Sequence, residues 1–414
     1  MATATSTSTA ASRSRASAVA LPRGLFARAC ILLAGAALAT LVTIKGLAVR
    51  AAVSDPQAAA LLAPYDARAA IASARAEVKA GGNVASPTVK RLVGQALARD
   101  ATLTSAIEIR ALEAEAARQP DRAGRLFELS SAISRRSLPT RLWLIQRSVN
   151  RGDVAGALAN FDIALRTSSD APEVLYPVLA SASSDPGLSL PLARLLDRPS
   201  EWREGFLHYA ITEAHAGPGV TGVLMHMADR RLIVGKQIDQ ALMGELLSEK
   251  AFALAKQVRG AFGPPSGAGL VADPHFADAR QPYPFGWLLI DSGPGDAQRV
   301  RSGGKTALEY QATPGGGGAV ATQLLTLPPG GYRLTVTTAA PANDRTSQPF
   351  WTLTCGDAGG QIAVLDQPGT AEASAGEDFT VPQGCTGQWL ALNLKTSDEP
   401  NLVGSIRSVE VTRR

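Results

Sequence analysis

The stretch GAFGPPSGAG, residues 260–269, separates two parts of this 414-residue chain that differ in hydrophobic period. Before it, apolar residues recur with helical spacing. After it, short runs alternate between apolar and polar residues and are separated by Gly and Pro. Helices repeat about every 3.6 residues and strands every second residue. We therefore expect a helical domain at 56–262, a linker at 263–272 and an all-β sandwich at 273–414.

The helical part contains two stretches of similar pattern, residues 111–139 and 144–172. An alanine and a phenylalanine of the first stretch each recur 34 residues later in the second stretch, and both stretches include a proline near the end. The corresponding residues are Ala123 and Ala157, Phe127 and Phe161, and Pro139 and Pro172. This period resembles the tetratricopeptide repeat, which implies an all-α solenoid of stacked helix pairs. Such an array either presents a surface to a protein partner or acts as a spacer.

A long apolar run lies near the amino terminus. Residues 25–44, LFARACILLAGAALATLVTI, are apolar except for Arg28, and Lys45 follows them. Twenty helical residues span about 30 Å, the thickness of a bilayer core. We expect a transmembrane signal anchor at 25–49. Positive charges are more numerous before this run than after it, so residues 1–24, rich in Ala, Ser and Thr, are predicted to form a disordered cytoplasmic tail.

A cleaved signal peptide is the alternative, because Ala51 or Ala52 fits a processing site. Both interpretations place the residues after 55 across the membrane. The excess of Arg over Lys and the many alanines indicate a GC-rich bacterial genome. We therefore expect a single-pass protein of the bacterial inner membrane, with most of its chain in the periplasm.

The formal net charge of +5 does not indicate nucleic-acid binding. Residues 1–55 hold six Lys or Arg against one Asp, whereas the β-region is slightly acidic. No segment combines a basic stripe with interleaved aromatic residues, the pattern that follows a phosphate backbone. We expect no nucleic-acid partner.

The three cysteines are Cys30, Cys355 and Cys385. Cys30 falls inside the apolar run, so only the other two share the β-region. An oxidising compartment favours a disulfide between Cys355 and Cys385. A metal site is the alternative, but two cysteines without a nearby histidine make a weak ligand set.

Nine alternating runs follow the linker and predict an antiparallel sandwich. They are WLLI, TALEYQA, AVATQLLTL, YRLTVTT, FWTLTC, QIAVLD, DFTV, QWLALNL and IRSVEV. The order of HFADARQPYPFGWLL, LLTLPPGGYRLTV, FWTLTC, FTVPQGCTGQWLAL and IRSVEV resembles that of the galactose-binding-like jelly-roll domains of carbohydrate-binding modules. The resemblance implies a jelly roll that holds a glycan at loops on one end or on a concave sheet face. HFAD, residues 275–278, departs from the Asn-Phe-acidic start common in that family.

The tryptophan in PFGWLLI, residues 284–290, has two interpretations: a platform on which a sugar stacks, or a core residue. Trp287 is in phase with Leu289, and Trp351 is in phase with Leu353. A tryptophan in phase with apolar neighbours is more often buried than exposed. The pattern therefore favours the core interpretation.

Sugar binding requires exposed aromatic rings for stacking and amide or charged groups for the hydroxyls. The residues of the β-region that fit this description are the candidate ligand-binding residues. They are Tyr283, Phe285, Tyr310, Gln388 and Asn393.

Familiar catalytic motifs are missing from the sequence. It contains no GxSxG nucleophile turn and no HExxH metal helix, and the glycine pattern before Gly304-Lys305-Thr306 fails the phosphate-loop rule. The histidines lack partners at metal-ligand spacing; they are His208, His215, His226 and His275. The candidate ligands for a calcium ion beneath a loop are Asp273, Asp278 and Asp291, but their spacing does not indicate a calcium site. We expect no catalytic residue, no metal and no cofactor.

These features together predict a non-enzymatic, membrane-anchored periplasmic accessory protein. Its helical arm carries a glycan-binding-like sandwich, which suggests a role in the assembly or export of exopolysaccharide or another envelope glycan. The partners expected are the inner membrane, a polysaccharide, and an envelope protein on the helical repeats. The alternative is a protein–protein scaffold of an envelope complex whose sandwich is purely structural.

Overall fold

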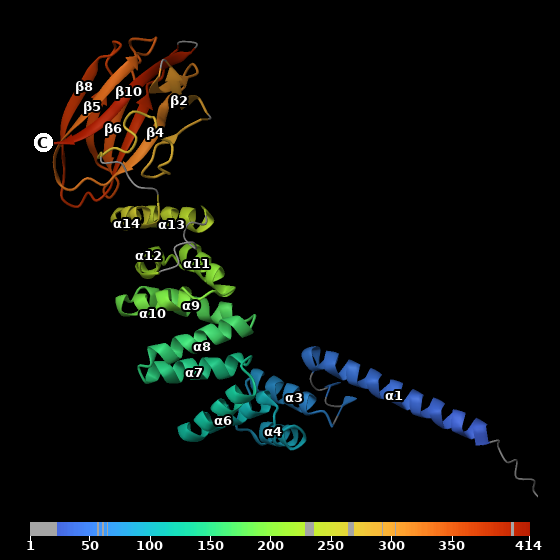
Figure 1. Cartoon of the computed structure of the whole chain (residues 1–414). Helices are drawn as coiled ribbons and strands as arrows, with labels where there is room; N and C mark the ends of the chain where they lie inside the picture. The colour runs from blue at the N-terminus through green and yellow to red at the C-terminus, as the bar shows by residue number, and fades with distance from the viewer. Residues whose placement is uncertain are drawn as a thin grey trace, which may run out of the picture. The chain divides into compact units, whose positions relative to one another are not determined.

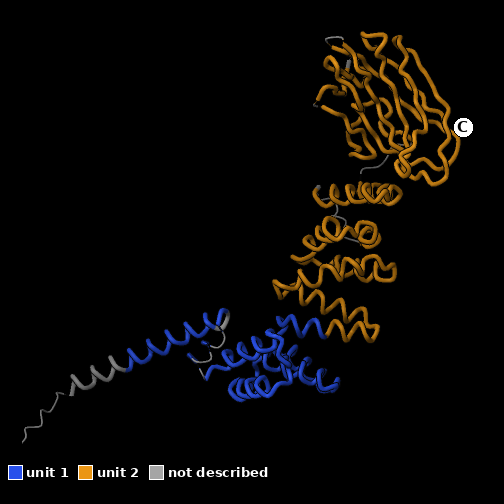
Figure 2. The backbone as a smooth tube through the Cα atoms, turned by 180° about the vertical axis from the view of Figure 1, so that it is seen from behind, with its two compact units in different colours: residues 1–143 blue, residues 144–414 orange. Residues whose placement is uncertain are grey.

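The computed structural model describes residues 23–55, 58–59, 62–63, 65–227, 236–263, 269–291, 293–302, 304–398 and 401–414 (Figure 1). The chain divides into two compact units, residues 1–143 and 144–414 (Figure 2). Helices occupy the described residues up to Phe262, and strands follow from Leu288. The β-region is thus confirmed to follow a helical region.

The helices have the following bounds: α1 Arg23–Ser54, α3 Ala67–Lys79, α4 Pro87–Arg99, α5 Thr104–Ala116, α6 Pro120–Ile133, α7 Leu138–Asn150, α8 Val154–Thr167, α9 Ala171–Ser183, α10 Pro186–Leu196, α11 Trp202–Thr212, α12 Gly217–His226, α13 Lys236–Ser248 and α14 Phe252–Phe262. Side-chain caps fix several starts, because an Asp or Ser oxygen accepts from a free backbone N–H of the first turn. Asp153 accepts from Gly156 N at 2.8 Å at the start of α8. Ser86 accepts from Val89 N at 3.2 Å at the start of α4.

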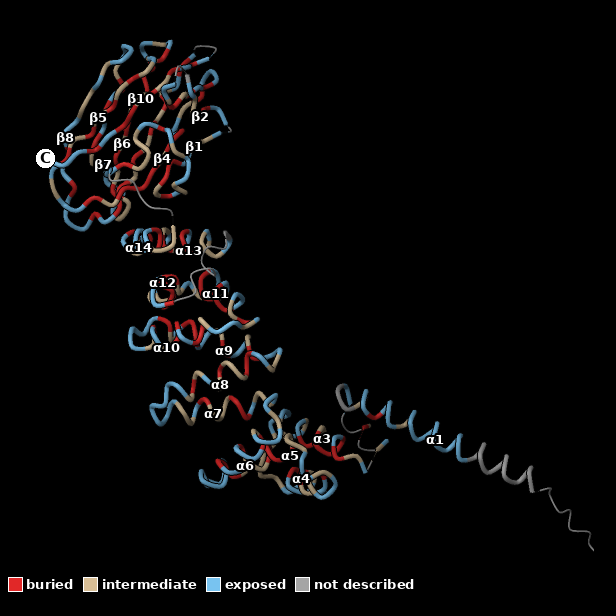
Figure 3. The backbone as a smooth tube through the Cα atoms, in the orientation of Figure 1, coloured by how far each residue is buried: buried red, intermediate tan, exposed pale blue. Residues whose placement is uncertain are grey.

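Helix α1 carries the apolar run. It is 32 residues long, and its segment Ala34–Ala51 is long and apolar enough to cross a membrane. Most of the described side chains of this segment are exposed (Figure 3). A signal sequence near an amino terminus satisfies the same length and hydropathy criteria. The predicted tail falls almost wholly on residues 1–22, outside the described ranges, as do the side chains of Arg28 and Cys30.

In the first unit, α3 packs on α4 and α5 on α6. Ile71 and Ala74 of α3 meet Val89 and Val93 of α4 in a buried cluster. Further along, the buried carboxylate of Glu108 accepts hydrogen bonds from Ser130 and Thr140, at 3.3 and 3.4 Å. A buried charge needs such partners.

In the second unit, the helices contact one another in two series. Helices α8, α10, α12 and α14 form one series, and α9, α11 and α13 form the other. The alanines and phenylalanines that match in the two repeat-like stretches, Ala123, Phe127, Ala157 and Phe161, are all buried. Their pattern therefore reflects packing, while the assignment to the tetratricopeptide family stays a prediction.

The strands are β1 Leu288–Leu289, β2 Gly295–Ser302, β3 Lys305–Ala312, β4 Gly318–Leu325, β5 Gly330–Ala340, β6 Phe350–Cys355, β7 Gln361–Asp366, β8 Ser374–Val381, β9 Gln388–Leu394 and β10 Leu402–Arg413. They form two five-stranded sheets. The first sheet has the order β1-β4-β9-β6-β7 and the second has the order β2-β3-β10-β5-β8. Every strand pair is antiparallel. The described residues after 269 thus form a β-sandwich, as predicted.

The core of the sandwich lies between the two sheets. Trp287 and Trp351 are both buried there, with ring centroids 5.8 Å apart in an edge-to-face arrangement. The indole N–H of Trp287 donates to the carbonyl of Asp273 at 3.1 Å, so this polar group is satisfied inside the core. The core interpretation of PFGWLLI is confirmed.

Helix α14 contacts the sandwich within the second unit. The ring of Phe252 lies against the backbone of Gly356 and Gly387, where a Cβ atom on either glycine would collide with it. The ammonium of Lys250 donates to the carbonyl of Asp357 at 2.7 Å. Two glycines without side chains therefore create the space that this aromatic ring fills.

Candidate functional site

The outer faces of the two sheets differ in chemistry. In β9 the side chains of Leu390, Leu392 and Leu394 enter the core, so Trp389 and Asn393 lie on the outer face of the first sheet. The outer face of the second sheet is charged and polar: Arg333 pairs with Asp378 at 2.7 Å, and Gln298 donates to Glu309 at 3.1 Å. The first sheet thus carries an aromatic side chain, Trp389, on its outer face.

The register of the strands defines this surface, which we name the aromatic face. Thr352 and Thr322 are the partners of Ala391 on the two flanking strands, and Phe350 and Asp366 lie opposite each other. Tyr283 joins from the segment before β1. The aromatic face consists of Tyr283, Leu288, Thr322, Phe350, Thr352, Val364, Asp366, Trp389, Ala391, Asn393 and Lys395.

An aromatic pair occupies one end of the face. The rings of Tyr283 and Trp389 are stacked, with centroids 6.0 Å apart and an interplanar angle of 22°. Tyr283 is 41% exposed and Trp389 is half-buried. Partial burial raises the pKa of Tyr283 above its ordinary value. The phenol is therefore neutral at pH values near 7, and its hydroxyl both donates and accepts hydrogen bonds.

Amide and hydroxyl groups occupy the middle of the face. Asn393 Nδ2 donates to Thr352 Oγ1 at 2.9 Å and to the carbonyl of Ala391 at 3.3 Å. Among the described residues, the Oδ1 atom of Asn393 accepts no hydrogen bond. The middle of the face therefore offers a fixed, half-buried acceptor to a ligand.

A charged pair occupies the other end. Lys395 Nζ lies 3.0 Å from Asp366 Oδ1 and 5.7 Å from the centroid of the Phe350 ring. Lys395 follows β9 and Asp366 ends β7, so this ion pair crosses over β6. The two charges neutralise each other locally.

The structure brings two of the five predicted ligand residues, Tyr283 and Asn393, onto one surface. Tyr310 and Gln388 are each 0% exposed. The Tyr310 ring belongs to the core, and the Gln388 amide accepts from Leu327 N and donates to Cys385 O, both at 2.8 Å. Neither side chain reaches the surface, because each occupies the inward phase of its strand.

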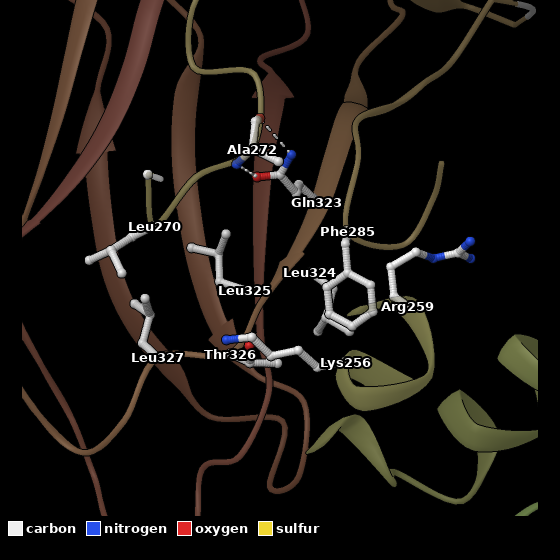
Figure 4. Close-up of a pocket in the computed structure, with 11 residues that line it drawn as sticks. Lys256, Arg259, Leu270, Ala272, Phe285, Gln323, Leu324, Leu325, Thr326 and Leu327 are labelled. Carbon is white, nitrogen blue, oxygen red and sulfur yellow. Dashed lines mark hydrogen bonds between the residues drawn. The ribbon is translucent and has the colours of Figure 1, made fainter. Parts of the chain in front are cut away.

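Phe285, the fifth predicted residue, lies half-buried beside helix α14. It lines a cavity of about 110 Å³ together with Lys256, Arg259 and Leu324 (Figure 4). Nearby, the Gln323 amide donates to Ala272 O at 2.9 Å and accepts from Ala272 N at 3.0 Å. This small cavity lies between α14 and the sandwich and leaves little room for a sugar.

Two aromatic residues of the face, Trp389 and Phe350, were missed among the sequence-predicted ligand residues. The signal was present in QWLALNL, because Trp389 shares its phase with Ala391 and Asn393 and not with the three leucines. Phe350 is likewise out of phase with Trp351 and Leu353. Strand phase is therefore the rule that separates the platform aromatics from the core aromatics here.

Cys355 and Cys385 form the predicted disulfide, with Cα atoms 5.7 Å apart. The carboxylate of Asp357 lies beside it and accepts from Thr386 N at 2.6 Å and Thr386 Oγ1 at 3.0 Å. The side chains of Cys355, Asp357 and Cys385 form a cluster with metal-ligand spacing. Because both sulfurs are consumed by the disulfide, the metal alternative does not fit this arrangement.

Two of the aspartates considered for calcium are paired with arginines. Asp273, whose side chain is 6% exposed, lies 3.4 Å from Arg299. Asp278 lies 2.7 Å from Arg280, and the hydrogen bond from Arg280 lowers the pKa of the Asp278 carboxyl to about 2. Asp291 is exposed. Arginines therefore supply the positive charge at these two carboxylates.

No protein-family model matches this sequence, and no curated protein matches it. Solved structures similar to part of the chain include the enzymatically active domain of tailspike protein 4 from bacteriophage CBA120. The match has 13% identity and a TM-score of 0.23, and covers 31% of this chain and 19% of the tailspike chain.

Two further similar structures are carbohydrate-binding modules. One is the CBM22-1 xylan-binding domain of Paenibacillus barcinonensis Xyn10C, with 11% identity, a TM-score of 0.25, and coverage of 36% of this chain and 97% of that domain. The other is a carbohydrate-binding module of the β-sandwich superfamily, with 14% identity, a TM-score of 0.21, and coverage of 36% and 64%.

Proposed function

We propose that this chain is a non-enzymatic accessory protein whose β-sandwich binds a glycan on the aromatic face. The observation that carries the proposal is the stacked pair of Tyr283 and Trp389 beside the Asn393 amide, on one open sheet face. Sugar rings bind to aromatic faces, and their hydroxyls bind to amides and hydroxyl groups that are held in place. The aromatic face supplies both.

The test is affinity electrophoresis of the full chain in detergent, through gels that contain a panel of polysaccharides. We expect at least one polymer to retard the protein, and Trp389→Ala to weaken that binding by about five- to thirtyfold, since loss of an aromatic contact costs on the order of 1–2 kcal/mol. Tyr65→Ala is the matched control, because Tyr65 is an exposed tyrosine of the first unit. Equal loss in both variants, or no retardation by any polymer, would refute the proposal.

The cellular role that we propose is assembly or export of exopolysaccharide or another envelope glycan, with α1 as a single-pass anchor in the bacterial inner membrane. The support is the apolar segment Ala34–Ala51 together with the disulfide, which forms in oxidising compartments. Alkaline phosphatase is active only outside the cytosol, so we expect a fusion of this enzyme after Arg414 to be active. An inactive fusion that is stably produced would rule out a periplasmic sandwich.

A protein–protein scaffold is the second candidate function, and a groove between α8 and α10 favours it. The groove measures about 340 Å³ and has an apolar floor that includes Leu158, Pro191 and Leu195. Arg194 of α10 and Arg198, two residues after the end of that helix, border it, and neither forms an ion pair with a described residue. We infer that an acidic, amphipathic segment of an envelope protein binds there.

A photo-crosslinker at Ala155 in the full chain, with Arg194→Glu/Arg198→Glu as the comparison, tests the scaffold function. Crosslinks to an acidic partner that disappear on charge reversal would support it. Crosslinks that are absent, or that survive the reversal, would count against this groove.

A further inference from the structure

We propose that the aromatic face selects an uncharged glycan chain, and that Asp366 is the residue that determines this specificity. The inference rests on the proposed function and adds the class of ligand. Asp366 acts by neutralising Lys395, the cation nearest to the Phe350 end of the face.

The charges of the face support this specificity. Among the residues that make up the aromatic face, Lys395 and Asp366 are the only charged ones, and they are paired at 3.0 Å. A carboxylate on a uronic acid, or a phosphate on a polymer, would be attracted to the ammonium of Lys395. It would also meet the like charge of Asp366 at nearly the same distance, so the attraction and the repulsion largely cancel.

A neutral sugar faces no such conflict. A hydroxyl group is both a donor and an acceptor. It can donate to a carboxylate oxygen of Asp366 while a neighbouring hydroxyl accepts from Lys395. Hydrogen bonds to charged groups are roughly twice as strong as those between neutral groups. Because the ion pair is largely exposed, with 41% and 72% of the two side chains accessible, both groups are open to a ligand.

The length of the face indicates that the ligand is a chain. Trp389 and Asn393 are four residues apart on β9, and Phe350 is the partner of Asn393 on β6. Four strand residues span about 14 Å. A single sugar ring does not reach both the Tyr283–Trp389 pair and the Lys395–Asp366 pair, whereas an oligosaccharide does.

The experiment compares neutral polymers (xylan, galactomannan and hydroxyethyl cellulose) with acidic polymers (alginate and polygalacturonate) by affinity electrophoresis of the full chain in detergent. Four proteins are measured: the parent chain, Asp366→Asn, Lys395→Gln and the double variant. Asp366→Asn keeps the size of its side chain, Lys395→Gln replaces an ammonium with a shorter neutral amide at a partly exposed site, and circular dichroism checks that each variant is folded. Oligosaccharides of increasing length, measured by calorimetry, test the need for a chain.

We expect the parent chain to bind a neutral polymer and to discriminate against the acidic ones. Asp366→Asn leaves Lys395 without its partner, so binding to an acidic polymer should increase by about tenfold, and salt above about 0.5 M should abolish this increase by screening. Lys395→Gln and the double variant should show no increase. This charge-specific, salt-dependent gain does not arise from a merely structural role.

The outcomes separate the inference from the proposed function. If the parent chain binds an acidic polymer better than any neutral one, and Trp389→Ala removes that binding, the glycan function stands and the selectivity is wrong. The same holds if Asp366→Asn gains no acidic binding. If no polymer binds in a manner that depends on Trp389, the glycan function itself fails.

Discussion

The hydroxyl of Tyr310 is buried in the core, and none of the described residues forms a hydrogen bond with it. It lies against Gly404, where any side chain would collide with it. Burial raises the pKa of Tyr310, so the group stays neutral. An unpaired buried polar group costs roughly 1–3 kcal/mol, and the fold therefore tolerates this hydroxyl rather than depending on it.

We predict that Tyr310→Phe leaves the sandwich as stable as the parent or stabilises it by up to about 1 kcal/mol, because the variant buries no unpaired oxygen. Tyr332→Phe is the matched control. Its hydroxyl is also buried but donates to the carbonyl of Pro328 at 2.9 Å, so its removal should cost about 1 kcal/mol. Urea denaturation of the full chain measures both. A Tyr310→Phe variant as unstable as the control would show that the hydroxyl has a partner.

At the level of single residues, the sequence predicts burial more readily than exposure. The alternation in FWTLTC places Trp351 in the core, and the structure confirms it. Tyr310 and Gln388 look like ligand residues by chemical type, but their strand phase places them inward. Which aromatic residues stack on one another across segments, as Tyr283 and Trp389 do, depends on the path of the chain before β1, and no local pattern encodes that path.

Among the elements, α14 owes its position to the contact between Phe252 and the glycines of two sandwich loops. A Cβ atom at Gly356 would lie 2.7 Å from Phe252 Cζ, well inside van der Waals contact. The contact is next to the Cys355–Cys385 disulfide. This bond restrains the loop that contains Cys385 and Gly387, so that loop cannot easily move away from the ring. This combination makes the glycine a steric requirement of the helix position.

We predict that Gly356→Ala destabilises the second unit by about 1–3 kcal/mol, the usual cost of overpacking. Gly360→Ala is the control, because a Cβ atom there meets nothing within 4 Å. In a double-mutant cycle, Phe252→Ala should relieve most of the penalty of Gly356→Ala, since the colliding ring is removed. Thermal unfolding measures the four proteins of the cycle and the Gly360→Ala control. Additive effects of the two changes would mean that the ring and the glycine do not meet.

The pattern of elements could be predicted because most strands alternate apolar and polar residues. All nine predicted runs appear as β1 and β3–β10, whereas β2 was missed. Its sequence, GDAQRVRS, offers only Ala297 and Val300 as apolar residues. It is a strand because β3 supplies a hydrogen-bonding partner along its whole length. Pairing of this kind is tertiary information.

On the scale of the whole molecule, the only disulfide among the described residues joins the end of β6 to the loop before β9. It closes a loop with a sequence separation of 30. A crosslink of this size stabilises a protein by about 3–4 kcal/mol, mainly by restricting the unfolded chain. The first unit lacks such a crosslink within its described residues.

We predict that Cys355→Ala/Cys385→Ala lowers the unfolding temperature of the second unit by roughly 10 °C. The transition of the first unit should not move. Cys30→Ala is the matched control and should change neither transition. Differential scanning calorimetry, with and without a reductant, distinguishes the units. If reductant shifts both transitions equally, the two units unfold as one cooperative body.

The Phe252 ring packs on Gly356 and Gly387, and Lys250 donates a hydrogen bond to Asp357, so the helical region contacts the sandwich in addition to being linked to it by the chain. A pulling force on the sandwich therefore reaches the helices through this contact as well as through the covalent chain. The Cys355–Cys385 disulfide links the end of β6 to the segment that contains Gly387, and both regions contact the Phe252 ring. We therefore expect this contact between helix and sandwich to resist separation under tension.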